Sequence, residues 1–158
     1  MWSVMLKKHI KIYVENSVIS AYHFAPRSIV AVTRRFFEKA VKEKYELFTS
    51  DVTIAELEKA KNDVREKSLK VIEAFKVKIV SMTVEAMDLA GEYVKRGVIP
   101  ARYRPDAEHI AVASVFGFDV LTSWNLSHIV KLKTKRLVKV INEEFGYPVP
   151  EIVRPDEV

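Results

Sequence analysis

The sequence contains no cysteine, and this absence excludes three classes of protein. Disulfide scaffolds, zinc sites with Cys ligands and enzymes with a cysteine nucleophile all need a sulfur atom that the chain does not carry. Glycine is scarce as well, with 4 residues in 158, and no glycine-rich fingerprint follows the first strand-like run. Dinucleotide binding at that place is therefore disfavoured.

The sequence also lacks a long hydrophobic run. Lys, Arg, Glu or Asp interrupts every apolar stretch before it reaches the roughly 18 to 20 residues that a bilayer span needs. Residues 1–6 are too short for the core of a signal peptide, and Lys7, Lys8 and Lys11 follow them instead of preceding them. We therefore expect no membrane association and a cytoplasmic location, where reducing conditions suit a chain without cysteine.

The length and the charge of the chain set further bounds. With 158 residues, 49% of them hydrophobic, the sequence fits one domain over residues 1–158 with enough apolar mass for a buried core. The 26 Lys and Arg residues exceed the 21 Asp and Glu residues, which gives a formal net charge of +5. This balance favours a polyanionic partner without establishing one.

Short strand-like runs alternate with longer helical patterns. The strand-like runs lie at residues 10–14, 46–49, 77–80 and 119–122, with a candidate edge strand at 151–154. Apolar residues at helical spacing predict helices that begin near residues 27, 51, 84 and 105, a helix with Val64, Val71 and Phe75 on one face, and a last helix that carries Leu137, Ile141 and Phe145. The short polar residues that we expect as N-caps are Asn16 or Ser17, Ser50 or Asp51, and Thr83. Strands separated by helices predict an α/β protein with a mostly parallel sheet of four to five strands, covered on both faces.

Four polar residues fall where an open parallel sheet is expected to carry its site, beyond the carboxyl ends of the strands. They are Glu15 after the first strand, Glu56 on the helix after the second, Asp106 at the start of the helix before the fourth, and Asn125 after the fourth. Clustered carboxylates repel one another unless a cation neutralises them, and hard oxygen ligands favour Mg²⁺ or Mn²⁺ over zinc. Such an ion activates water and offsets charge on a phosphodiester, so these residues predict nuclease chemistry.

Four stretches, in this order, carry a resemblance to a known family: residues 12–20 (IYVENSVIS), 49–57 (TSDVTIAEL), 105–111 (PDAEHIA) and 121–129 (LTSWNLSHI). Each stretch alone is a weak signal, whereas their order and combination are specific. Over nearly its whole length the chain resembles the PIN-domain nucleases, and among them the ribonuclease toxins (VapC) of VapBC-type toxin-antitoxin pairs.

The resemblance implies a three-layer α/β/α fold and an endoribonuclease that depends on Mg²⁺ or Mn²⁺. It implies that Glu15, Glu56 and Asp106 bind the metal, that the hydroxyl of Ser17 supports the site, and that Asn125 stands where many relatives have a further Asp. It also implies an antitoxin partner that covers the site, and a homodimer.

Two positions depart from the family pattern. Glu15 is one methylene longer than the usual Asp, and Asn125 supplies a neutral oxygen in place of a charge. These departures predict a weakened activity or an altered metal preference, and they leave open a catalytically weakened PIN-like module that binds RNA or protein. A receiver domain is disfavoured, because residues 80–81 are Val-Ser where a phosphoacceptor Asp is needed.

Basic residues near these stretches are candidates for phosphate binding. We expect contacts to RNA from Arg102 and Arg104 and from the run at residues 131–136, in which Lys133 is central. A run of charge is also typical of an ordinary solvated helix face.

The acidic residues have structural interpretations as well. Glu56 stands three residues before Lys59, which is typical of a surface ion pair. Asp106 in a first helical turn favours the positive end of the helix dipole, and Glu15 at a strand end is compatible with a solvent-facing residue.

The ring side chains near the candidate site receive structural interpretations. We interpret His109 and His128 as residues that pack or hydrogen-bond within the structure. Trp124 is suited to stacking on a base, but a Trp beside a strand end more often closes a core, so we expect it to pack.

Overall fold

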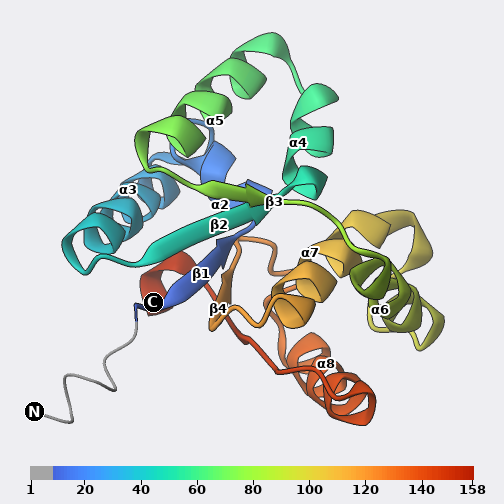
Figure 1. Cartoon of the computed structure of the whole chain (residues 1–158). Helices are drawn as coiled ribbons and strands as arrows, with labels where there is room; N and C mark the ends of the chain where they lie inside the picture. The colour runs from blue at the N-terminus through green and yellow to red at the C-terminus, as the bar shows by residue number, and fades with distance from the viewer. Residues whose placement is uncertain (1–8) are drawn as a thin grey trace, which may run out of the picture.

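The computed structural model describes residues 9–158 (Figure 1). The residues 1–6, for which no signal peptide is expected, lie outside the described part. In chain order the elements are β1 (Lys11–Val14), α2 (Asn16–Ala21), α3 (Arg27–Lys42), β2 (Glu46–Ser50), α4 (Asp51–Glu58), α5 (Asn62–Ala74), β3 (Lys78–Val80), α6 (Val84–Lys95), η1 (Ala101–Tyr103), α7 (Arg104–Val115), β4 (Val120–Thr122), α8 (Leu132–Phe145), β5 (Glu151–Val153) and η2 (Pro155–Glu157).

The five strands form one sheet in the order β3-β2-β1-β4-β5, and every pairing is parallel. This confirms the expected sheet, including β5 as an edge strand. The strand order reverses between β1 and β4, which lie side by side with Val14 level with Thr122. The loops after β1 and β4 therefore leave the same edge of the sheet as neighbours, which is where α/β sheets bind their ligands.

Helices cover both faces of the sheet, so the predicted three-layer α/β/α arrangement is confirmed (Figure 1). Successive residues of β1 show how the layers form, because side chains alternate between the two faces of a strand. Ile12 and Val14 join the core with Phe37 of α3, whereas Tyr13 joins the opposite core with Ile110 of α7. All of these side chains are at most 1% exposed.

The helix boundaries test the expected caps. Ser50 and Thr83 cap α4 and α6, as predicted. The prediction for α2 is wrong, because its N-cap is neither Asn16 nor Ser17 but Glu15. The backbone of Glu15 is extended (φ −73°, ψ 152°), and its carboxylate accepts a hydrogen bond from the backbone N–H of Ser17. The predicted last helix is confirmed, because α8 carries Leu137, Ile141 and Phe145 and ends before Gly146; it begins at Leu132, so the basic run forms its first turns.

Trp124 packs against the core formed with α3, as predicted. Its indole Nε1 donates a hydrogen bond to Thr33 Oγ1 at 2.9 Å, which satisfies the polar edge of the partly buried ring.

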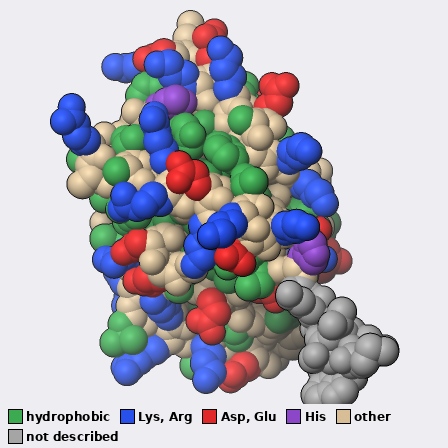
Figure 2. Space-filling view, turned by 90° about the vertical axis from the view of Figure 1, so that its left-hand side faces the viewer, with side chains coloured by type: hydrophobic (Ala, Val, Ile, Leu, Met, Phe, Trp, Pro, Cys, Tyr) green, Lys and Arg blue, Asp and Glu red, His purple; other side chains and the backbone are tan. Residues whose placement is uncertain are grey.

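The face at the amino-terminal ends of the strands carries mixed charge. Figure 2 shows Lys and Arg side chains dispersed there among Asp, Glu and hydrophobic side chains. This face therefore presents no field of a single sign to a polyanion. Within residues 9–158, no helix is both long enough and apolar enough to cross a bilayer.

Candidate metal centre and active site

Glu15 lies directly after β1 and is 5% exposed, so its interpretation as a solvent-facing residue is wrong. Three donors hold its carboxylate. Oε1 accepts hydrogen bonds from Ser17 Oγ at 2.6 Å and from Ser123 Oγ at 2.5 Å, and Oε2 accepts one from Ser17 N at 2.9 Å. Hydrogen bonds to the charged form stabilise a buried carboxylate as an anion.

The same two hydroxyls join the loops that follow β1 and β4. Ser17 Oγ accepts a hydrogen bond from Trp124 N at 2.9 Å, and Ser123 Oγ accepts one from Asn125 N at 2.9 Å. Asn125 in turn accepts a hydrogen bond at Oδ1 from His128 N at 2.9 Å. Glu15 and Asn125, which lie 110 positions apart in the sequence, are thus part of one hydrogen-bonded unit.

Glu56 reaches this site from α4, on the other side of Glu15. Its Oε1 lies 2.6 Å from His109 Nε2, and the same nitrogen lies 3.8 Å from Glu15 Oε2. The alternative of a surface ion pair with Lys59 is not supported, because no such pair occurs within residues 9–158. Glu56 is half-buried and points inward.

His109 comes from α7 and is fully buried. Its Nδ1 lies 2.6 Å from the hydroxyl of Tyr13, which lies 2.7 Å from Ser50 Oγ. Both ring nitrogens are therefore engaged and the imidazole is fixed in orientation. The interpretation of His109 as a hydrogen-bonded core residue is confirmed, but it misses that Nε2 faces two carboxylates.

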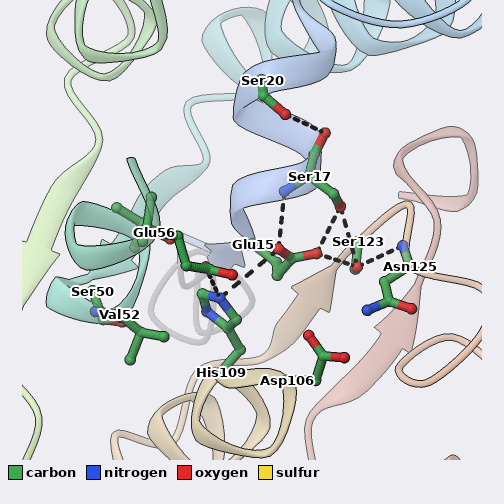
Figure 3. Close-up of polar contacts among 12 residues, drawn as sticks. Glu15, Ser17, Ser20, Ser50, Val52, Glu56, Asp106, His109, Ser123 and Asn125 are labelled. Atoms are coloured by element: carbon green, nitrogen blue, oxygen red, sulfur yellow. Dashed lines mark hydrogen bonds and ion pairs between the residues drawn. The ribbon is translucent and has the colours of Figure 1, made fainter. Parts of the chain in front are cut away.

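Asp106 belongs to the first turn of α7, three residues before His109 and so on the same face of the helix. Its Oδ2 lies 3.0 Å from His128 Nδ1. In Figure 3 the carboxyl groups of Asp106, Glu15 and Glu56 and the ring of His109 are directed toward one another, with Asn125 beside Asp106.

The electrostatics show that these groups share one environment. Burial and the negative charge of Glu15 raise the pKa of Asp106, and hydrogen bonds from Asn125 and His128 offset only part of that effect. Burial by itself lowers the pKa of His109, but interactions with Tyr13, Glu56 and Glu15 outweigh it and raise that pKa well above its usual value. A cationic ring is thus favoured where negative charge gathers.

The donor set fits a small divalent cation. Glu15, Glu56 and His109 each offer one ligand atom, and these atoms all lie within 4.8 Å of one another. Asp106 adds a third carboxylate close enough for Glu15 to shift its pKa. Carboxylates with a single imidazole are compatible with Mg²⁺ and with first-row transition-metal ions.

The expected phosphate-binding residues differ in where their side chains lie relative to the acidic site. Arg102 donates a hydrogen bond to the Tyr103 hydroxyl at 2.9 Å. The centroid of the Tyr103 ring lies 4.2 Å from the ring centroid of His128, and His128 in turn contacts Asp106. Arg104 instead turns toward α6, where its Nη2 donates a hydrogen bond to the Met87 carbonyl at 3.2 Å. Lys133 is exposed in the first turn of α8.

The fold thus brings together Glu15, Ser17, Glu56, Asp106 and Asn125, and it leaves Arg104 outside this group. Sequence reasoning missed the contributions of His109 and Ser123. A signal existed for both: His109 follows Asp106 at helical spacing, and Ser123 follows β4 at the same sheet edge as Asn125.

Comparison with known proteins gives a likeness to solved structures. No family model matches the chain, and no curated protein matches it. A chain of VapBC2 from Rickettsia felis, solved bound to a DNA fragment from its promoter, superposes with a TM-score of 0.55 at 14% identity, covering 92% of this chain and 98% of that one. A chain of DNA-bound VapBC from Salmonella typhimurium gives 0.51 at 18% identity, with the same two coverages.

A third likeness is weaker. VapC20 of Mycobacterium tuberculosis, a Sarcin-Ricin loop cleaving toxin, gives a TM-score of 0.49 at 17% identity over 70% of this chain and 86% of that one. At such identities the first two matches are evidence of fold. This chain accordingly has the α/β/α fold of the VapBC structures, the PIN-like fold that its sequence motifs imply.

Proposed function

We propose that this protein is a metal-dependent endoribonuclease that hydrolyses RNA phosphodiester bonds and acts as the toxin of a type II toxin-antitoxin pair. One observation carries the proposal: Glu15, Glu56 and His109 each offer a ligand atom within 4.8 Å of the others at the carboxyl edge of a parallel sheet, and the carboxyl group of Asp106 lies beside this group (Figure 3). The fold shared with VapBC structures supports it.

In this proposal, the residues of the site have different roles. A bound Mg²⁺ or Mn²⁺ supplies activation of a water molecule and neutralisation of phosphate charge. Glu15 and Glu56 would hold the ion, and Ser17 and Ser123 fix the rotamer of Glu15 through their hydroxyls. Asn125 orients Asp106 from the loop after β4, so its neutral amide serves positioning where relatives have a further charge.

The approach of RNA is assigned to the side of the site that carries Tyr103. Its ring is in contact with the guanidinium of Arg102, 4.9 Å from the ring centroid, and with the ring of His128. Cationic and aromatic groups side by side suit the phosphates and bases of a single strand. Arg102 and Lys133 are the phosphate ligands in this proposal, whereas Arg104 is engaged with α6.

The proposed partners follow from the family. The two superposed structures are VapBC complexes bound to DNA, and by analogy an antitoxin covers the acidic site of this chain. We further propose a homodimer and a cytoplasmic location. A short upstream open reading frame that encodes a DNA-binding fold would support the pairing, and sedimentation of the purified protein as a monomer would contradict the dimer.

The test is cleavage of structured and single-stranded RNA by the purified protein with Mg²⁺ or Mn²⁺. We expect cleavage that EDTA abolishes and that Glu56→Gln reduces by at least roughly a hundredfold, since a ligand to the ion is lost. Glu58→Gln is the matched control, because Glu58 is exposed on the same helix. No cleavage of any RNA with either ion would contradict the proposal, as would equal effects of both variants.

One observation favours a second candidate, the module that binds RNA or protein without turnover. Three of the roughly four lone-pair positions of the Glu15 carboxylate already accept hydrogen bonds from Ser17 and Ser123. Under this alternative the wild-type protein binds RNA but leaves it intact, and the double variant Glu15→Asp, Asn125→Asp gains cleavage. Robust turnover by the wild type would eliminate it.

A further inference from the structure

The Nε2 atom of His109 lies within 4.8 Å of one carboxylate oxygen of Glu15 and one of Glu56. Two ligands held at about 2.1 Å from one ion, at right angles, are about 3 Å apart. Nε2 lies 2.6 Å from Glu56 Oε1 and 3.8 Å from Glu15 Oε2, distances on either side of that value. Small side-chain adjustments therefore bring all three atoms onto one ion.

The far side of the ring is arranged as in known metal-binding histidines. Such a histidine usually donates its second ring N–H to a neighbouring acceptor, which fixes the tautomer and the ring orientation. Here the neighbour is the buried hydroxyl of Tyr13, 2.6 Å from Nδ1. Because Tyr13 also contacts Ser50 Oγ at 2.7 Å, its own proton has a second acceptor when it accepts from Nδ1. That tautomer leaves the lone pair of Nε2 directed at the carboxylates.

The Glu15 carboxylate has one lone pair left for a metal ion, and it lies on the side of His109. Oε1 accepts two hydrogen bonds from hydroxyls, whereas Oε2 accepts one, from Ser17 N. The unused lone pair therefore belongs to Oε2, the oxygen on the side of His109. Once an ion displaces the proton of Nε2, Glu15 and His109 each have one free electron pair on the shared side of the site.

We propose that His109 Nε2 is a ligand of the divalent ion and gives the centre a preference for Mn²⁺ over Mg²⁺; this rests on the function proposed above and specifies its metal. Mg²⁺ takes oxygen ligands almost exclusively, whereas an imidazole ligand favours transition-metal ions of the first row. A centre with carboxylates and one imidazole therefore binds Mn²⁺ more tightly than carboxylates alone would.

The experiment is electron paramagnetic resonance of the full chain with Mn²⁺ as the probe. Spin-echo measurements detect coupling between bound Mn²⁺ and a ligand nitrogen, and protein labelled with ¹⁵N-histidine identifies that nitrogen as an imidazole. Titration with Mg²⁺ gives the ratio of the two affinities. The variants are His109→Gln and, as a matched control, His23→Gln, whose ring is exposed beside Arg34.

We expect histidine nitrogen coupling in the wild type and in His23→Gln, and none in His109→Gln. The ratio of Mn²⁺ to Mg²⁺ affinity should fall roughly tenfold in His109→Gln alone. If His109→Gln fails to fold, the labelled wild type still decides, because the coupling is either present or absent there.

Two results overturn the proposal in distinguishable ways. In the first, the wild type binds Mn²⁺ and Glu56→Gln does not, but the bound Mn²⁺ shows no coupling to His109. This result leaves the nuclease proposal intact and means that His109 only positions Glu56. A wild-type protein that binds neither ion overturns both this proposal and the metal-dependent nuclease.

Discussion

At the scale of single residues, the site depends on polar groups that are buried and held by hydrogen bonds. Glu15 is held by two hydroxyls and one backbone amide, and His109 is held at both ring nitrogens. Leaving one such group without its partner costs more free energy than an average hydrogen bond contributes. Precise placement of the carboxylates therefore depends on small serine side chains.

Substitution of Ser123 by alanine should show this dependence. The variant removes one hydrogen bond from Glu15 Oε1 and leaves Asn125 N without its acceptor. We expect the free energy of unfolding to fall by about 1–3 kcal/mol, measured by urea denaturation. Ser68→Ala is the matched control, because the Ser68 hydroxyl is buried but makes no hydrogen bond within residues 9–158. A Ser123→Ala variant as stable as Ser68→Ala would contradict the assigned role.

At the scale of elements, α7 connects the site to the core behind it. Asp106 and His109 lie on the face toward the carboxylates, and the same helix packs on α6 and carries Ser114 into a buried contact with Tyr93 and Asn142. Tyr93 of α6 also donates a hydrogen bond to Asn142 Oδ1 of α8. Three helices thereby meet at one tyrosine hydroxyl, which fixes α7 against the sheet.

This buried tyrosine predicts a pH dependence of stability. Burial is the largest effect and raises the pKa of Tyr93 far above its usual value, so the native state keeps the proton while the unfolded chain releases it above about pH 10. A raised pKa in the native state means that stability is complete below that pH and declines as the pH rises further. Between pH 8 and 11, the free energy of unfolding measured by denaturation should fall more steeply for the wild type than for Tyr93→Phe. Parallel curves for the two proteins would contradict this role of Tyr93.

At the scale of the whole molecule, the two ends of the sheet differ in the charge that they carry. Basic and acidic side chains mix over the face in Figure 2, whereas carboxylates gather at the opposite, carboxyl edge of the sheet. Without an ion, the folded chain must tolerate this concentration of negative charge, which His109 and hydrogen bonds offset in part. Binding of a divalent cation should therefore stabilise the native state as a whole.

Addition of Mn²⁺ should raise the melting temperature of the protein. A ligand that binds only the native state stabilises it by about 2.7 kcal/mol at a hundred times its Kd. We expect a rise of several degrees in differential scanning calorimetry, reversed by EDTA and absent in Glu56→Gln, whereas Glu58→Gln keeps it. An equal rise in both variants would show that Mn²⁺ acts elsewhere on the molecule.

The sequence by itself determined the alternation of strands and helices and the parallel sheet. It also determined that Glu15 and Asn125 follow strands, that Asp106 stands at a helix start, and that Glu56 lies on the helix after the second strand. These features follow from local periodicity and composition, which are readable in short windows. The caps at Ser50 and Thr83 were equally local.

Only the tertiary structure decided that His109 faces the carboxylates, that Ser123 holds Glu15, and that Arg104 turns away toward α6. The reason is physical: β1 and β4 become neighbours through a pairing over more than 100 positions, and that pairing has no local signal. Side-chain directions at the site are then fixed by burial and hydrogen bonding among residues that meet only after the sheet has formed.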